Sequence, residues 1–240
     1  MAFEALPVLL GYLWRIFPIM GLCAVWLCST PRAQTGMQLL ILIFAFIGIR
    51  DMMTPCGLWH LGGEPPLRFH RNHWVLALLG LGSIVLIAML AQFLPRCWRL
   101  VVGFKGNCTT GLAIGITAGC IIGLPIRFYL ELELAPFLWL FCFALFAFAG
   151  NALEEVLFRG MLQSQLERHT TAQRAALCSA CAFCACHSYL AFVLTDHGWP
   201  IVLFTMVEGL ICSQVRLKFG TWPATATHGT AILMIGAPLA

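Results

Sequence analysis

The chain alternates long apolar runs with short breaks of polar or turn-forming residues. A helix needs roughly 20 mostly apolar residues to cross the hydrocarbon core of a bilayer, and eight runs approach or reach this length. Breaks such as Thr30–Pro31–Arg32 and Gly198–Trp199–Pro200 separate them. The predicted spans are 7–28, 37–55, 74–94, 110–130, 136–157, 173–194, 199–216 and 222–239. This pattern predicts an all-α, polytopic transmembrane helical bundle of about eight spans.

The amino-acid composition indicates that lipid, not water, surrounds most of the protein's surface. Hydrophobic residues make up 60% of the chain and charged residues only 10%, whereas soluble domains carry roughly 25% charged residues. The spans would use most of the 240 residues, so we expect no separate soluble domain. Glu4 stands where a cleaved signal peptide would carry basic residues, and the first run is therefore interpreted as a span.

The distribution of basic residues predicts an orientation. The odd-numbered loops hold eight lysines and arginines and the even-numbered loops four, with Arg50 and Arg127 in the smaller group. Because cytoplasmic loops carry the excess of basic residues, we expect the odd-numbered loops in the cytoplasm and both termini outside. The net charge of +4 is modest and does not indicate a nucleic-acid partner.

Ionisable groups gather where the fifth apolar run ends, at 151–160. Such groups are costly inside a membrane and usually functional. Glu154 and Glu155 are adjacent, so they point in different directions on a helix. Arg159 follows Glu155 by four residues, the spacing of a helical ion pair, which leaves Glu154 to face another helix. The alternative is a cluster of charges at a helix end on the membrane surface.

Two later runs each contribute a histidine. His187 lies within the sixth run, four residues after Phe183, and His228 lies within the eighth run among threonines. Either could be an ordinary hydrogen-bonded core residue. Taken with Glu154, however, three helices each supply a group that handles protons. A buried carboxylate could act as general base on one water, one imidazole could hold that water, and the other could stabilise an oxyanion.

These residues fall into motifs that resemble those of a known family. In chain order the motifs are Glu154–Glu155–x–x–x–Arg159, Phe183–x–x–x–His187, Gly220–Thr221–Trp222–Pro223 and His228. The order and spacing resemble the CAAX protease and bacteriocin-processing (CPBP, abortive-infection) family of glutamic intramembrane proteases. The resemblance covers roughly residues 136–235. We therefore expect one continuous membrane domain in two parts, with N-terminal helices at 1–110 and CPBP-like catalytic helices at 111–240.

The resemblance also implies roles. Glu154 corresponds to the catalytic glutamate, His187 to the histidine that activates water with it, and His228 to the oxyanion-stabilising group. Glu155 and Arg159 would support this site. The implied enzyme is a glutamic-type hydrolase without a cofactor, in a bacterial or archaeal cell membrane. Its partners would be the lipid bilayer and a membrane-anchored substrate: a prenylated protein, a bacteriocin-like peptide or a C-terminal sorting tail.

One position departs from the family pattern. The family commonly has asparagine or another polar residue four positions after the last histidine, and this chain has Ile232, which cannot donate a hydrogen bond. We hypothesise that Asn151, Thr227 or Thr230 supplies the missing donor. Without a substitute the enzyme would be slow or inactive, because losing one oxyanion donor costs roughly 2.7–4 kcal/mol.

The remaining polar residues point less clearly to chemistry. Glu208 could pair with a histidine or with Ser213, or could line a substrate path. Four cysteines precede His187 with spacing that superficially resembles an iron–sulfur run, but no Gly or Pro loop surrounds them and the haem signature fails. No His-Glu-x-x-His zinc motif is present. We therefore expect packing roles and no metal. The four cysteines are Cys178, Cys181, Cys184 and Cys186.

Two other functions fit the same residues less well. A catalytically inactive membrane scaffold or immunity factor is favoured by Ile232. An ion-coupled transporter could use Glu154, His187 and Glu208 as a proton relay. Transporters often contain inverted repeats and broken helices, and we find neither pattern in the sequence, so this function ranks last.

Overall fold

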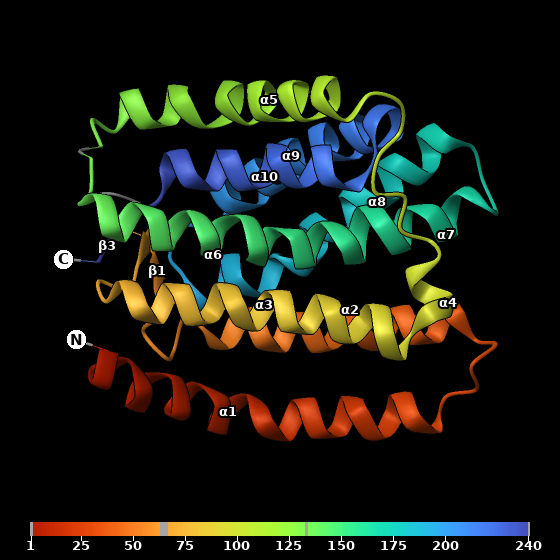
Figure 1. The fold of residues 1–240 in the computed structure, drawn as a ribbon, viewed down its shortest axis with the longest axis horizontal. Coiled ribbons are helices and arrows are strands. Elements are labelled where there is room, and N and C mark those ends of the chain that lie inside the picture. The colour runs from red at the N-terminus through yellow and green to blue at the C-terminus, as the bar shows by residue number, and fades with distance from the viewer. Residues whose placement is uncertain (1, 63–66, 133, 240) are drawn as a thin grey trace.

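Long helices that run side by side make up most of the chain (Figure 1). The structure is a computed structural model that describes residues 2–62, 67–132 and 134–239. Among these residues the long helices are α1 (Ala2–Ser29), α2 (Thr35–Met52), α3 (His73–Phe93), α5 (Cys108–Tyr129), α6 (Phe137–Glu155), α8 (Ala172–Cys186), α9 (Gly198–Phe219) and α10 (Thr221–Ile235). The shorter helical segments are α4 (Pro95–Trp98), η1 (Val156–Leu162), α7 (Gln163–Glu167) and η2 (Leu190–Leu194). The predicted all-α bundle is confirmed.

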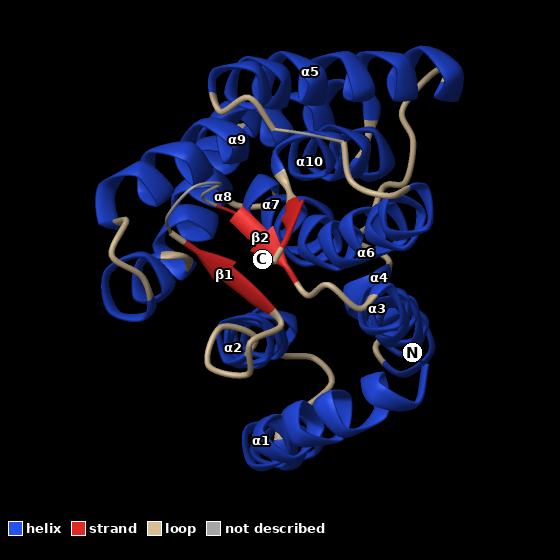
Figure 2. Ribbon diagram, turned by 90° about the vertical axis from the view of Figure 1, so that its left-hand side faces the viewer, coloured by secondary structure: helices blue, strands red, loops and turns tan. Residues whose placement is uncertain are grey.

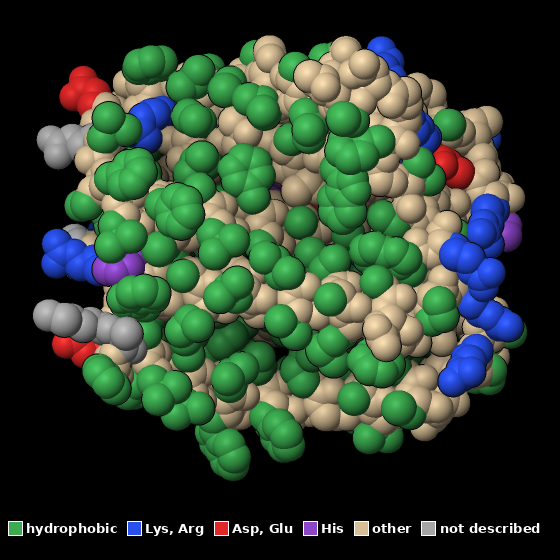
Figure 3. Space-filling view, viewed as in Figure 1, with side chains coloured by type: hydrophobic (Ala, Val, Ile, Leu, Met, Phe, Trp, Pro, Cys, Tyr) green, Lys and Arg blue, Asp and Glu red, His purple; other side chains and the backbone are tan. Residues whose placement is uncertain are grey.

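The outer surface of the bundle is apolar. Seven helical stretches in the described part of the chain are long and apolar enough to cross a membrane. Hydrophobic side chains are spread over the whole face seen in Figure 3, and lysines and arginines gather at its right-hand edge. That edge is the end of the bundle at which α4 and α7 lie in Figure 1. The chain is therefore an integral, multi-pass membrane protein.

The eighth predicted span differs from the other seven. It corresponds to α10, which has 15 residues and is about 22 Å long, shorter than the hydrocarbon core of roughly 30 Å. Most of α10 is buried inside the protein, and it packs against α5, α6 and α9. It is an interior helix that other helices shield from lipid, and the residues after it form a strand instead of continuing to 239.

The fifth span is longer than predicted. The helical path does not end near residue 157 but continues from α6 through the π-helix η1 and α7, so that the span covers Phe137–Glu167. Glu154 and Glu155 consequently lie in the interior of the span and not in a surface charge cluster. The helix can continue because Glu155 and Arg159 neutralise each other inside the protein. π-Helical segments are rare and often occur at functional sites.

A seam of glycines brings α5 close to α10. Gly111, Gly115, Gly119 and Gly123 recur every four residues and are all buried, so they share one face of α5. A Cβ atom added at Gly119 would lie only 2.4 Å from the backbone oxygen of Thr227. Small residues of this kind let two helix backbones approach closely within a membrane. The seam fixes the position of the helix that carries His228.

A small sheet lies across the end of the bundle where both termini are found (Figure 2). Strand β1 (Trp59–Leu61) pairs antiparallel with β2 (Leu67–Phe69), and β2 pairs in parallel with β3 (Ala237–Pro238). The sequence analysis did not predict these strands, because each has at most three residues. Phe69 anchors the sheet to α6, with its ring centroid 4.6 Å from that of Phe143.

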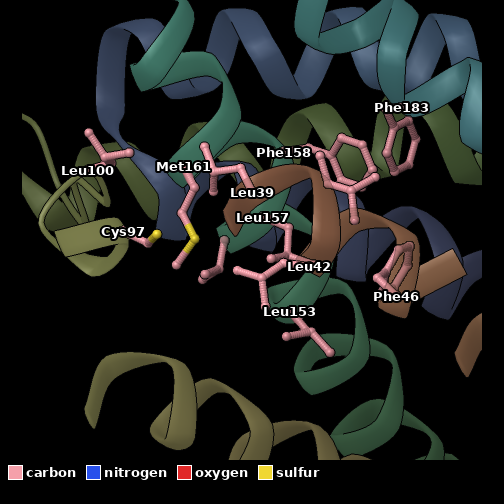
Figure 4. Packing of buried hydrophobic residues seen from close by; sticks show 12 residues of the cluster. Leu39, Leu42, Phe46, Cys97, Leu100, Leu153, Leu157, Phe158, Met161 and Phe183 are labelled. Atoms are coloured by element: carbon pink, nitrogen blue, oxygen red, sulfur yellow. The ribbon is translucent and has the colours of Figure 1, made fainter. Parts of the chain in front are cut away.

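The largest apolar cluster joins α2 to η1 and α8 (Figure 4). Phe46 and Phe158 meet edge to face with centroids 6.1 Å apart, and Phe158 and Phe183 do so at 5.2 Å. Edge-to-face contacts of this kind stabilise a structure by roughly 0.5–1.5 kcal/mol beyond the burial of area. The row of rings ends at Phe183, directly beside the polar interior.

The glycine seam leads to a prediction about stability. Gly119→Ala should lower the melting temperature in detergent, because a Cβ there overlaps backbone atoms of α10, and overpacking typically costs about 1–3 kcal/mol. Gly82→Ala in α3 is the matched control, since nothing lies within 4 Å of its added Cβ. Equal melting temperatures for the two variants would show that the close contact between α5 and α10 does not stabilise the bundle.

Candidate active site

Glu155 is the centre of a buried network of charges. Its side chain is fully buried, and its Oε1 lies 2.9 Å from Nη1 of Arg159 and 3.0 Å from Nδ1 of His228. The ion pair predicted between Glu155 and Arg159 is thus present. One carboxylate thereby joins α6, η1 and α10.

Arg159 extends the network to α8 and α9. It is fully buried, its Nη2 donates a hydrogen bond to the backbone oxygen of Gly209 at 3.2 Å, and its guanidinium lies 4.2 Å from the centroid of the Phe183 ring. A carboxylate, a carbonyl and an aromatic face together compensate the loss of hydration. Arg159 therefore positions the helices around the polar interior.

Glu154 has different surroundings from its neighbour. Only 9% of its surface is exposed, and its Oε2 is buried without a hydrogen-bond partner among residues 2–62, 67–132 and 134–239. Glu154 faces a cavity that Glu155 does not line. The sequence analysis predicted this division, in which Glu155 is paired and Glu154 is turned toward other helices.

His187 lies on the same cavity, at the C-terminal end of α8. Its Nδ1 is 2.8 Å from the backbone oxygen of Phe183, and its ring packs against the Phe183 ring at 4.5 Å. A carbonyl oxygen only accepts hydrogen bonds, so Nδ1 must carry the proton. In the neutral imidazole Nε2 then has a free lone pair, which is suited to hold a water or accept its proton.

His228 is held between two carboxylates. Its Nδ1 contacts Glu155, and its Nε2 lies 3.3 Å from Oε2 of Glu208. Of the alternatives considered for Glu208, the histidine is therefore the partner, and Ser213 is not. The Phe183 ring meets the His228 ring edge to face at 5.6 Å, which fixes the imidazole further.

The cavity that these residues line has a volume of about 320 Å³. Its wall is mainly aromatic and aliphatic, and it includes Trp59, Leu61 and Phe69 of the small sheet. Its ionisable and amide side chains are Arg50, Asn151, Glu154, His187, His197, Glu208 and His228. An apolar cavity with a few convergent polar groups is typical of a ligand or active site.

The three donors proposed to replace the family asparagine lie in different places. Asn151 lines the cavity, and its Nδ2 is buried without a hydrogen-bond partner among the residues described. Thr227 is fully buried and donates to the backbone oxygen of Pro223, and neither Thr227 nor Thr230 lines the cavity. Ile232 does line it. The geometry therefore favours Asn151.

Arg50 is a cavity residue that the sequence analysis did not identify. The expectation that Arg50 lies in a loop is wrong, because it lies within α2, is 3% exposed and lines the cavity. Its Nη2 donates to the backbone oxygen of Cys186 at 2.6 Å, next to His187. The adjacent charges of Arg50 and Asp51 inside an apolar run are the signal that could have revealed it.

The cysteines before His187 do not converge. Cys178 and Cys181 are exposed on α8, whereas Cys184 is buried and its thiol donates to the backbone oxygen of Val202. Within the described ranges, no group of three or more His, Cys, Asp or Glu side chains is placed to hold a metal ion. The cluster therefore gives no evidence of a shared site.

A multi-pass bundle with a carboxylate and an imidazole on an interior cavity defines a membrane protein with a candidate intramembrane hydrolase site. Residues 135–234 match the family model described as Type II CAAX prenyl endopeptidase Rce1-like. These residues contain Glu154, His187 and His228, and the predicted resemblance is confirmed over this segment. The matched segment is thus similar to the CAAX-type intramembrane proteases, a class of membrane-embedded hydrolases. No curated protein and no solved structure matches the chain.

The contrast between the two glutamates predicts different effects on stability. Glu155→Gln should lower the free energy of unfolding in detergent by about 3–5 kcal/mol, because it leaves the buried Arg159 without its carboxylate. Glu154→Gln removes no ion pair, so its unfolding should stay close to that of the wild type. If Glu155→Gln unfolds like Glu154→Gln, the network around Glu155 does not hold the helices together.

Proposed function

We propose that the protein is a glutamic-type intramembrane endopeptidase in which Glu154 and His187 activate one water. The observation that carries this proposal is the unpaired carboxylate of Glu154, which faces the cavity beside an imidazole with a free nitrogen. The match to the Rce1-like family supports the class of reaction. The mechanism and the site residues are our own proposal.

In the proposed reaction, water lies between Glu154 and Nε2 of His187. Glu154 accepts a proton as the water oxygen bonds to the carbonyl carbon, and the carbonyl electron pair moves onto its oxygen. When the tetrahedral intermediate collapses, the C–N bond breaks and the proton held by Glu154 passes to the leaving nitrogen. The reaction needs no covalent enzyme intermediate.

Glu155, Arg159, Phe183 and His228 act in this proposal as positioning residues. They connect α6, η1, α8 and α10, and they set the direction in which Glu154 and His187 face. The family resemblance implies that His228 stabilises the oxyanion, but the contacts of both its ring nitrogens argue against this role. An oxyanion would have to compete with Glu208 for Nε2 and with Glu155 for Nδ1.

We propose a membrane-associated protein or peptide as the substrate. The cavity is mainly apolar and lies within the bundle, so it suits a segment that enters from the bilayer with apolar side chains or a lipid group. A prenylated protein, a bacteriocin-like peptide and a C-terminal sorting tail all meet this description. A bacterial or archaeal cell membrane remains the predicted location.

The main alternative is a catalytically inactive scaffold or immunity factor. The observation that favours it is Ile232, which lines the cavity where the family commonly places a polar residue. The alternatives differ in a simple respect. A scaffold would retain its cellular function after Glu154→Gln and would cleave no peptide, whereas a protease would lose both cleavage and function.

Substituting Glu154 tests the proposed base. We expect Glu154→Gln to abolish cleavage of a membrane-tethered peptide library, with its melting temperature preserved, because the amide cannot accept the proton. Glu131→Gln is the matched control, since Glu131 is exposed after α5, outside the cavity. Activity should be insensitive to a chelator, and inhibition by the chelator would point to a metal-dependent reaction instead. Undiminished cleavage by Glu154→Gln would refute the role of this residue.

Asn151 provides a second test of the site. Asn151 lines the cavity one turn before Glu154, and its buried Nδ2 has no partner among the described residues, so we expect Asn151→Ala to lower kcat by about 10²–10³-fold with little change in KM. Steady-state kinetics on a reconstituted peptide substrate measure this. An unchanged kcat would remove Asn151 from the oxyanion site.

A further inference from the structure

The usual donors for an oxyanion are missing or occupied in this chain. Both ring nitrogens of His228 have a carboxylate within 3.3 Å, and Ile232 offers only methyl and methylene groups to the cavity. A developing oxyanion in an apolar cavity requires preorganised donors, because water is largely excluded there. Asn151 offers one neutral donor on this cavity, and a cationic donor facing the reacting carbonyl would stabilise the negative charge further.

Arg50 has the properties that such a donor needs. It is 3% exposed, it lines the cavity together with Glu154 and His187, and its Nη1 is buried without a hydrogen-bond partner among the described residues. A buried guanidinium nitrogen without a partner is costly, and one that lines a cavity can be satisfied by a group bound there. An anionic oxygen would satisfy it.

The other nitrogens of Arg50 are fixed. Nε and Nη2 donate to Oδ1 of Asp51 at 2.8 and 2.6 Å, and Nη2 also donates to the backbone oxygen of Cys186 at 2.6 Å. Because Cys186 directly precedes His187, this bond joins the guanidinium to the end of α8 that carries the candidate water-activating imidazole. A planar guanidinium held at two nitrogens has its third nitrogen in a defined direction.

We propose that Arg50 is the cationic oxyanion donor of this enzyme. This inference rests on the proposed hydrolysis by Glu154 and His187. As the water oxygen bonds to the carbonyl carbon and its proton passes to Glu154, the carbonyl electron pair becomes an oxyanion, and Nη1 of Arg50 donates its hydrogen bond to it. The bond is released when the C=O bond reforms and the C–N bond breaks. Arg50 keeps its proton throughout.

A different anionic oxygen could compete for the same nitrogen, namely the free C-terminal carboxylate of a substrate. We favour the oxyanion because the contact with the Cys186 carbonyl places Arg50 next to His187, where the carbonyl must react. The two anions have separate kinetic effects. An oxyanion contact exists only in the transition state and governs kcat, whereas a carboxylate contact also exists in the bound substrate and governs KM.

The test compares Arg50→Met and Arg50→Lys with the wild type on a reconstituted peptide substrate. We expect Arg50→Met to lower kcat by about 10²–10³-fold with KM unchanged, and Arg50→Lys to retain part of the rate through its charge. Affinity for a phosphinate peptide, which imitates the tetrahedral anion, should fall by a similar factor in Arg50→Met. Added methylguanidine should partly restore the rate.

Arg216→Met is the matched control, because Arg216 is equally buried and is paired with Glu167 but does not line the cavity. It should lower the melting temperature without changing kcat per folded molecule. If Arg50→Met does not fold, Arg50→Lys and Arg50→Gln replace it. Their kcat and their affinity for the phosphinate peptide are then compared with those of the wild type.

Two results would overturn the proposal. One is an unchanged kcat in folded Arg50 variants while the wild type cleaves. The other is a rise in KM that disappears when the substrate's C-terminus is amidated, which would assign Arg50 to carboxylate recognition. If the protein is not a protease at all, the wild type itself will cleave nothing. This result is distinguishable from a failure of the Arg50 proposal, in which the wild type cleaves.

Discussion

A buried charge in a membrane protein must have partners inside the protein, and the carboxylate of Glu155 meets this constraint for the whole site. It lies within 3.0 Å of both Arg159 and His228, and Arg159 in turn contacts the backbone of α9 and the ring of Phe183. Breaking one link would leave an uncompensated ion where hydration is not available. The remaining features of the site follow from this arrangement, because it fixes the helices from which Glu154 and His187 reach the cavity.

The two adjacent glutamates show how one helix separates support from chemistry. Glu155 Oε1 is held by Arg159 and His228, whereas no ion pair holds Glu154, whose carboxylate lies on the cavity. The arginines differ in a similar way, since Arg159 lies away from the cavity against Glu155 and Phe183, whereas Arg50 lines the cavity and its Nη1 has no partner among the described residues. Glu154 and Arg50 thus present unpartnered polar atoms to the cavity, while Glu155 and Arg159 hold the helices around it. Function is proposed for Glu154 and Arg50 because a ligand in the cavity could complete their hydrogen bonding.

The sequence predicts features that depend on local periodicity. Apolar runs located the helices, and the four-residue spacing from Glu155 to Arg159 predicted their ion pair. Features that depend on contacts between distant segments could not be predicted from local periodicity. Arg50 is buried because it contacts the backbone of Cys186, 136 residues away, and α10 is short because neighbouring helices shield it from lipid. The extension of the fifth span to Glu167 depends on internal charge pairing, and the strands of two or three residues carry too little pattern to be recognised.

The pairing of β3 with β2 also has a mechanical consequence. β3 follows α10 after a single residue, and α10 carries His228 and abuts the glycine seam of α5. A load applied to the C-terminus, for example by a fused protein or an attached surface, would pass through this short strand into the helix that holds the imidazole. The pairing of β3 with β2 and the single residue between β3 and α10 thus connect the C-terminal strand directly to the helix that carries His228.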